Sequence, residues 1–213
     1  MRYIFDLDGT LIDSSERMYQ LFCELIPECT LTKEEYWSYK RDKVNHKKLI
    51  EMLYPHIQFD VFERKWMQLI EIDTYLCMDQ NYVDTIEVLS SLYDRGHELY
   101  LLTARQSKSG LIDELKRLKL IGYFKQVLTT EGKASKEDIL LVHSKTDNCI
   151  MDTGNVFVSD MGKDIELGNK YGFQTVAITH GFMSEERLKA YKPKKVIREL
   201  SEISEMEYSS KSV

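Results

Sequence analysis

The chain has 213 residues and a formal net charge of −6 at pH 7, with a pI near 5.5. This acidic balance argues against a general nucleic-acid-binding surface, and no apolar stretch is long enough to suggest a membrane span. The N-terminus lacks the features of a secretory signal, and the four cysteines form no CxxC pair. We therefore expect a cytoplasmic protein with reduced thiols that binds neither nucleic acid nor a membrane.

The first predicted element is a short apolar strand over residues 2–6. It runs into two aspartates separated by one residue, Asp6 and Asp8, and Gly9 and Thr10 follow. Two carboxylates about 4 Å apart repel each other by roughly 4 kcal/mol at an effective dielectric constant near 20. The pair therefore predicts a cation at the end of this strand.

The next part of the chain, residues 14–79, is predicted to be helical. Apolar residues recur at helical spacing in four runs, over residues 15–26, 30–42, 46–55 and 59–76. In the second run, Thr32 and Glu35 have the spacing of a capping box, which marks a helix start. Three or four helices are expected, and the aromatic residues expected in their core are Tyr19, Phe22, Tyr36 and Trp37.

After residue 80, predicted strands alternate with predicted helices. The strands are expected at 97–103, 124–129, 155–160, 173–181 and within 194–200, and the helices at 81–96, 109–122, 135–144 and 163–172. This alternation predicts a parallel sheet with helices on its faces. Disorder is expected only in the last residues, 208–213.

The predicted fold class is therefore α/β, with a helical domain inserted into a parallel-sheet core. Residues 1–13 and 80–213 are expected to form the core, and residues 14–79 the insert. In open α/β sheets, ligands bind beyond the carboxyl ends of the strands. The residues suited to chemistry fall at these ends or close to them: Asp6, Asp8, Thr103, Lys136, Asp160 and Asp164.

These residue types suit phosphoryl transfer. Asp6 is a candidate carboxylate nucleophile that would form an aspartyl-phosphate, and Asp8 is a candidate general acid and base. Mg²⁺ is bound by oxygen ligands and would offset the repulsion between carboxylates, to which Asp160 adds another. Thr103 and Lys136 would contact the phosphoryl oxygens, over which charge spreads in the transition state.

Four segments also resemble a known family. The sequences DLDGTL at 6–11, LLT at 101–103 and SDMGKD at 159–164, with Lys136 at a helix start, resemble the ordered motifs of the haloacid dehalogenase (HAD) superfamily. The resemblance covers nearly the whole chain and is greatest for the phosphoglycolate phosphatase-like and β-phosphoglucomutase-like branch. It implies a Rossmann-like core in which residues 14–79 form an α-helical C1 cap.

The resemblance also implies residue roles. It makes Asp6 the nucleophile and Asp8 the acid/base. Mg²⁺ is expected to be bound by the Asp6 carboxylate, the Asp8 backbone carbonyl and Asp160, with Asp164 in support. The residues expected to contact the substrate, and above all its phosphate, are Gly9, Thr10, Thr103, Ala104, Arg105 and Lys136.

Some positions depart from the family pattern or allow two interpretations. Ser159 stands where glycine is usual, and Lys163 places a cation in the acidic loop. Lys133 is an alternative to Lys136 as the phosphate-binding lysine. Arg105 could instead be a solvated loop residue, and Asp164 could simply favour the helix macrodipole at a helix start.

Two features of the insert and its surroundings are also open. The basic run at residues 39–48 is either a solvated face or a patch that attracts an acidic, phosphorylated substrate. His46 and His180 could border the cleft, although a lone histidine is more often structural or exposed.

The resulting prediction is a Mg²⁺-dependent phosphatase of small phosphorylated metabolites, active as a monomer or homodimer. A phosphomutase would use the same aspartyl-phosphate but return the phosphoryl group to a sugar. A non-catalytic regulatory protein is a third possibility, because a fold by itself does not define a function.

Overall fold

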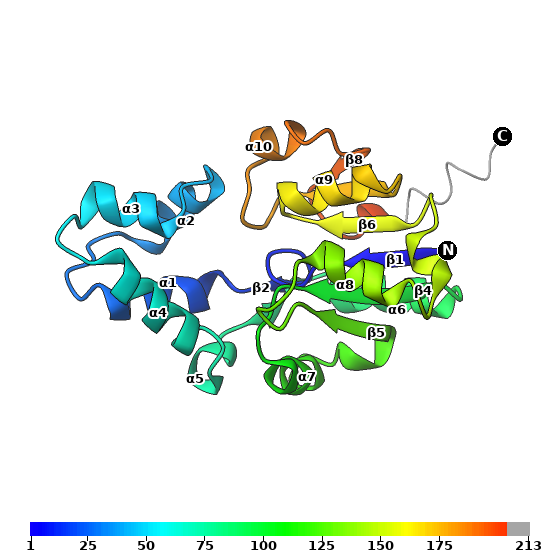
Figure 1. Ribbon diagram of the computed structural model, residues 1–213, viewed down its shortest axis with the longest axis horizontal. Coiled ribbons are helices and arrows are strands. Elements are labelled where there is room, and N and C mark those ends of the chain that lie inside the picture. Colours follow the sequence, from blue (N-terminus) through cyan, green and yellow to red (C-terminus); the bar gives the residue numbers. More distant parts are fainter. Residues whose placement is uncertain (204–213) are drawn as a thin grey trace.

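The computed structural model describes residues 1–203, so the expected disorder at 208–213 lies outside the described residues. Its centre is a six-stranded sheet with strand order β5-β4-β1-β6-β7-β8 (Figure 1). All five neighbouring pairs are parallel. The strands are β1 (Arg2–Phe5), β4 (Glu98–Thr103), β5 (Phe124–Thr129), β6 (Val156–Ser159), β7 (Gln174–Ile178) and β8 (Lys195–Ile197).

The central strand β1 is buried on both faces. Tyr3 and Phe5 pack into one apolar cluster that includes side chains of α6 and α7. Ile4, which points to the opposite face, packs into a second cluster that includes Leu140 of α8. Helices therefore cover both faces, as expected of a parallel sheet. The helices of this part of the chain are α6 (Thr85–Asp94), α7 (Lys108–Arg117), α8 (Lys136–His143), α9 (Gly162–Lys170) and α10 (Glu185–Lys189), with short 3₁₀ turns η1 (Ile121–Tyr123) and η2 (Asn148–Met151).

Five further helices lie together beside the sheet and cover neither of its faces (Figure 1). Their apolar side chains form a separate cluster around Phe22, Tyr36 and Trp66, with Tyr19 and Trp37 packed against it. The expected capping box at Thr32 is present. The helices are α1 (Ser15–Leu25), α2 (Lys33–Arg41), α3 (His46–Leu53), α4 (Phe59–Leu69) and α5 (Asp73–Leu76).

The structure differs from the expected helices at one point, because the single run predicted over 59–76 is interrupted. α4 ends at Leu69, and α5 starts only at Asp73. Between them, the Glu71 carboxylate accepts hydrogen bonds from the backbone amides of Gln106 at 2.9 Å and Ser107 at 2.9 Å, just before α7. This contact with the core takes Glu71 out of the helix.

A two-stranded antiparallel ribbon joins the helical insert to the core. It consists of β2 (Ile12–Asp13) and β3 (Gln80–Asn81), which pair where the chain leaves the core and where it returns. Two-residue strands leave no periodicity in a sequence, so this ribbon was not predicted. It nevertheless places the two connecting segments side by side.

The α/β fold with a Rossmann-like core and an inserted α-helical cap is confirmed. The division into 1–13 and 80–213 for the core and 14–79 for the cap stays a prediction. Over residues 1–203, no helix is both long and apolar enough to span a membrane. The four cysteines carry free thiols.

Candidate active site

Three neighbouring strands end at the same edge of the sheet and bring the candidate residues together. β1 lies between β4 and β6, with Phe5 paired to Leu101 and to Val158. Asp6 therefore follows β1 close to Thr103, the last residue of β4, and to Asp160, which follows β6. The parallel arrangement thus places residues separated by more than 50 positions in one site.

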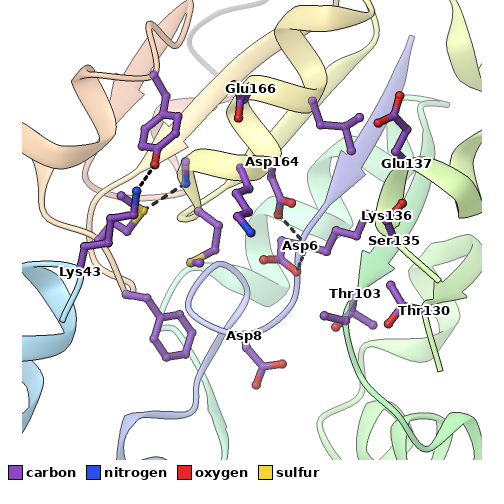
Figure 2. A pocket seen from close by; sticks show the side chains of 18 of the residues that line it. Asp6, Asp8, Lys43, Thr103, Thr130, Ser135, Lys136, Glu137, Asp164 and Glu166 are labelled. Carbon is purple, nitrogen blue, oxygen red and sulfur yellow. Dashed lines mark hydrogen bonds and ion pairs between the residues drawn. The ribbon is translucent and has the colours of Figure 1, made fainter. Parts of the chain in front are cut away.

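Lys136 is the cation next to Asp6. Its Nζ lies 2.8 Å from Asp6 Oδ1 and 2.6 Å from Asp164 Oδ2 (Figure 2). Ser135 caps the start of α8 and so fixes where the Lys136 side chain leaves the helix. Lys133 is exposed and lies 3.4 Å from Glu131 instead. Of the two lysines considered from the sequence, the structure brings Lys136 to the site.

The carboxylates at this edge carry more negative charge than Lys136 can offset. Burial raises the pKa of Asp6 to about 7, and repulsion from Asp164 acts in the same direction, although Lys136 opposes both. Burial, followed by repulsion from Asp6, raises the pKa of Asp160 well above its usual range. A further cation at this edge would favour the ionised form of both groups.

Asp160 is held from two sides and lies below the surface of the site. Its Oδ1 accepts a hydrogen bond from Thr10 Oγ1 at 3.1 Å, and its Oδ2 accepts one from Phe182 N at 2.6 Å. A Cβ on Gly9 would lie 2.3 Å from Oδ2, and one on Gly181 would lie 2.2 Å from it. Both glycines are therefore required for Asp160 to fit, and Gly9 also has a positive φ of 76°.

Thr10 and Gly9, which the sequence predicts to contact the substrate, lie beneath the cavity and not along its wall. The Thr10 side chain is fully buried and bonded to Asp160. Neither Thr10 nor Gly9 is among the residues that line the cavity described below. In this structure both residues lie against Asp160, and their contact with the substrate stays a prediction.

Ser159, the residue that departs from the family pattern, contacts the site directly. Its Oγ donates a hydrogen bond to Asp164 Oδ2 at 2.8 Å and lies 3.5 Å from Asp6 Oδ2. It also accepts a hydrogen bond from Met161 N at 3.0 Å. The serine therefore fixes Asp164 and the start of the loop, which glycine could not do.

Asp8 is held by two arginines and its carboxylate points away from Asp6 (Figure 2). Arg105 Nε and Nη2 lie 2.7 and 2.9 Å from the two Asp8 oxygens, and Arg17 Nη2 contacts Oδ1. Burial would raise the pKa of Asp8, but Arg105 and Arg17 outweigh it and lower the value to about 2. In this arrangement Asp8 is ionised.

Arg105 is neither a solvated loop residue nor part of the cavity lining. It is 4% exposed and also lies 3.0 Å from Asp79 and 3.0 Å from Glu114. The expectation that it contacts the substrate is therefore replaced by a contact with Asp8. Arg17 joins the same group because its Nε lies 2.9 Å from Asp79.

This group of five charged side chains, Asp8, Arg17, Asp79, Arg105 and Glu114, is referred to below as the hinge network. Arg17 comes from the first cap helix, and Asp79 precedes β3, where the chain returns to the core. The hinge network therefore connects both segments that join cap and core to the candidate acid/base. No sequence pattern predicted it, because single charged residues far apart in the chain form no recognisable motif.

A cavity of about 970 Å³ opens between the cap and the catalytic edge. The expected site residues that line it are Asp6, Asp8, Thr103, Ala104, Lys136 and Asp164. The cap contributes Met18, Lys40, Lys43, Val44 and Asn45. The basic run at 39–48 thus divides into residues that face the cavity and residues such as Lys47 and Lys48 that are exposed outside it.

The two histidines considered from the sequence do not line this cavity. His46 lies in the aromatic core of the cap, with its Nε2 2.8 Å from the Tyr36 hydroxyl. His180 stacks on Tyr82 with 3.6 Å between ring centroids, and its Nε2 lies 3.1 Å from the Thr10 carbonyl oxygen. Both histidines therefore contact other residues of the fold and lie outside the cavity.

The donor set at this edge fits Mg²⁺ on chemical grounds. Asp6 and Asp160 are buried carboxylates whose repulsion is only partly offset, and the Asp8 backbone carbonyl follows Asp6 closely in the chain. Within residues 1–203, no group of three or more His, Cys, Asp or Glu side chains is arranged to hold a metal ion. Two carboxylates and a carbonyl still suffice for Mg²⁺, which usually keeps several water ligands.

Comparisons with known proteins found a family model and relatives that match most of the chain. A family model described as haloacid dehalogenase-like hydrolase matches residues 3–178. The pyrophosphatase PpaX of Bacillus mycoides (strain KBAB4) is 24% identical over 225 residues, which cover 94% of this chain and 93% of the relative.

Solved structures share the fold over almost the full length. A haloacid dehalogenase-like family hydrolase from Streptococcus pneumoniae has a TM-score of 0.76 at 21% identity and covers 96% of this chain and 97% of its own. A predicted phosphoglycolate phosphatase from Haemophilus somnus 129pt has a TM-score of 0.75 at 16% identity, with 96% of each chain covered. The family and the HAD-type phosphohydrolase class expected from the sequence are confirmed: the chain belongs to the haloacid dehalogenase-like hydrolase family.

Proposed function

We propose that the protein is a Mg²⁺-dependent phosphatase that hydrolyses phosphate monoesters of small metabolites through an aspartyl-phosphate on Asp6. The observation that supports this most is the state of the Asp6 carboxylate. Its Oδ1 accepts a hydrogen bond from Leu7 N at 2.8 Å and contacts Lys136, whereas Oδ2 has, among residues 1–203, only the 3.5 Å contact with Ser159. One oxygen is thus fixed, and the other is available to attack a phosphorus atom in the cavity.

In the first step, Asp6 Oδ2 forms a bond to phosphorus while the bond from phosphorus to the leaving oxygen breaks. Lys136 and the Thr103 hydroxyl contact the phosphoryl oxygens and stabilise the charge that develops there. The leaving oxygen takes a proton from Asp8, which can carry that proton only after its contacts with Arg105 and Arg17, which keep it ionised in this structure, have opened. Mg²⁺, bound by Asp6, the Asp8 carbonyl and Asp160 with Asp164 in support, would neutralise the carboxylates and the phosphoryl group.

In the second step, a water molecule attacks the phosphorus atom of the aspartyl-phosphate. Asp8 accepts the proton from this water, and the bond between phosphorus and Asp6 breaks. Inorganic phosphate leaves, and both aspartates return to their initial states. Closure of the cap over the cavity would keep other water away from the intermediate.

The hinge network favours a second candidate, hydrolysis of pyrophosphate. The Asp8 carboxylate has two guanidinium partners, so it must give up at least one of these contacts before it can deliver a proton to a leaving oxygen. A phosphate leaving group needs less help from a proton donor than an alkoxide does. The similarity to relatives named pyrophosphatase PpaX supports the same substrate.

The experiment that tests the proposed function is hydrolysis of a chromogenic phosphate monoester, with Mg²⁺ and with excess EDTA. Wild-type protein should turn over the ester only with Mg²⁺ and should yield an acid-stable, hydroxylamine-sensitive phosphoenzyme. The Asp6→Asn variant should lose both signals, with its far-UV circular dichroism unchanged. Retention of phosphatase activity in Asp6→Asn would exclude this mechanism.

The two candidates are separated by comparing pyrophosphate with methyl phosphate. A phosphatase of monoesters should hydrolyse both, whereas a pyrophosphatase should favour pyrophosphate by at least about 10²-fold in kcat/KM, since the alkoxide departs without an effective acid.

A further inference from the structure

The cavity has one wall from the core and another from the cap, and these walls differ in their charged groups. The core wall contains Lys136 and the carboxylates that take part in the proposed reaction. The cap wall contains two lysines, Lys40 and Lys43, and no acidic residue. Because the phosphoryl group is proposed to react at Asp6, the remainder of the substrate extends toward this basic wall.

Most lysines along the cavity already have a partner. Lys136 contacts two aspartates, and Lys170 Nζ lies 2.6 Å from Glu137. Lys43 Nζ donates to the Tyr191 hydroxyl at 2.5 Å. Lys163 lies on the core wall and is exposed to solvent.

Lys40 is different, because it is largely withdrawn from water without gaining a partner. Burial lowers the pKa of Lys40 to about 8, and no neighbouring carboxylate acts on it. In the part of the chain that the structure describes, its Nζ forms no hydrogen bond and no ion pair. Lys40 acts in turn on His46, whose pKa is lowered well below its usual range by burial and then by repulsion from Lys40. An ammonium group in such surroundings is stabilised by an anion that enters the cavity.

The position of Lys40 over the cavity is fixed by its neighbours on α2. Arg41, the next residue, donates from Nη1 to the Gly181 carbonyl at 2.9 Å and from Nη2 to the Thr179 carbonyl at 2.9 Å. One turn earlier, the Trp37 ring lies 5.0 Å from the ring of Phe182. These contacts join the end of α2 to the loop that follows β7. A charge held in one place can discriminate between substrates, whereas a mobile surface charge cannot.

We propose that Lys40 binds a second anionic group of the substrate, a carboxylate or a phosphate carried by the leaving group. The inference rests on the proposed function and adds the substrate class: a metabolite with one phosphoryl group for transfer and a second anion on the other side of the scissile bond. On the same cap wall, Met18 and Val44 carry no charge and the Lys43 ammonium is bonded to the Tyr191 hydroxyl, which leaves Lys40 as the cation of this wall that is unpartnered among residues 1–203 and able to bind such an anion.

The test compares substrates that differ only in the second anion. 2-Phosphoglycolate is paired with 2-hydroxyethyl phosphate, and ethylene glycol bisphosphate with the same monoester, so that every leaving group is an alkoxide. The quantity measured is the ratio of kcat/KM within each pair. Wild-type protein should favour the member with two anions in at least one pair, and the pair concerned identifies a carboxylate or a phosphate as the natural group.

Lys40→Met should lower that ratio by about 10- to 100-fold, mainly through KM, which corresponds to the loss of one charge-assisted hydrogen bond. Lys40→Arg should restore part of the preference. Lys47→Met is the matched control, because Lys47 belongs to the same basic run but is exposed and does not line the cavity. This control should leave the ratio within twofold of the wild-type value.

Two results would overturn the inference: no preference for a second anion in the wild-type protein, or the same preference in Lys40→Met. Binding of phosphonoacetate and of ethylphosphonate, measured by calorimetry with Mg²⁺, gives the same comparison without turnover. If no ester is hydrolysed, the proposed function fails, and the calorimetric preference still decides the role of Lys40.

Discussion

Asp6 and Asp8 are separated by one residue, yet their carboxylates have opposite surroundings. Asp6 has one cationic neighbour, Lys136, and its pKa is raised to about 7, first by burial and then by repulsion from Asp164. Asp8 has two, and Arg105 and Arg17 lower its pKa to about 2 against the effect of burial. The side chains around Asp6 come from the strand ends and helices of the core, whereas Asp8 is contacted by Arg17 of the cap helix α1 and by Arg105 of the core loop after β4.

This difference separates the side chains that should govern the chemical step from those that should govern the stability of the fold. Substitutions beside Asp6 should change the chemical step, because their targets face the phosphoryl group. Substitutions in the hinge network should change the stability of the fold first, because they leave buried charges without partners. The predictions below test this separation, starting with the largest expected effect.

Arg105→Met should cause the largest loss of stability. It removes the guanidinium that contacts Asp8, Asp79 and Glu114, and the loss of one partner from a buried ion pair typically costs about 3–5 kcal/mol. Urea denaturation monitored by circular dichroism measures the free energy of unfolding. Lys108→Met, an exposed change three residues further on, should alter it by less than about 0.5 kcal/mol. Equal free energies of unfolding for Arg105→Met and Lys108→Met would show that the contacts of Arg105 in the hinge network contribute nothing to stability.

Lys136→Met should have the largest effect on catalysis among substitutions that leave the nucleophile in place. It removes the cation 2.8 Å from Asp6 and should lower kcat by about 10²–10³-fold, as for other groups that stabilise transition-state charge. Lys133→Met is the matched control, since Lys133 is exposed and contacts only Glu131. A larger loss in Lys133→Met than in Lys136→Met would reverse the assignment of the phosphate-binding lysine.

The same division explains which parts of the site could be predicted from the sequence. The surroundings of Asp6 are set by a parallel sheet, so each strand end in the sequence indicates a residue at one edge. Thr103 and Asp160 were placed in this way, whereas Lys136 was chosen because it stands at a helix start that resembles a family motif. The partners of Asp8 depend on how the cap folds back onto the core, and no local pattern records that contact. Arg105 was therefore assigned to the substrate, and Arg17 and Asp79 were missed.

Glu114 should make stability depend on pH. Burial raises the pKa of Glu114 from 4.5 to about 8, with hydrogen bonding to Asp79 in the same direction and Arg105 opposing both. A raised pKa in the folded state means that the stabilisation is complete below about pH 4.5 and is lost as the pH rises through about 8. Each proton contributes a slope of about 1.4 kcal/mol per pH unit within that window. Urea denaturation at intervals from pH 5.5 to 8 should show this decline.

Glu114→Gln should reduce the slope, because glutamine does not titrate. Asp79, whose pKa burial also raises, should retain a slope of the same sign. Identical pH dependence in wild type and Glu114→Gln would place the titrating group elsewhere.

Ser159→Ala should have the smallest of these effects. It changes the surroundings of Asp6 and Asp164, both of which Ser159 Oγ contacts. The change removes the hydrogen bond to Asp164 Oδ2, so Lys136 becomes the only side chain bonded to that oxygen. Lys136 is then drawn toward Asp164 and away from Asp6, and kcat should fall by about fivefold, equivalent to about 1 kcal/mol, with KM unchanged. Ser38→Ala, an exposed change on α2, is the control. An unchanged kcat in Ser159→Ala would mean that the Ser159 hydroxyl contributes nothing to the position of Lys136 at the Asp6 carboxylate.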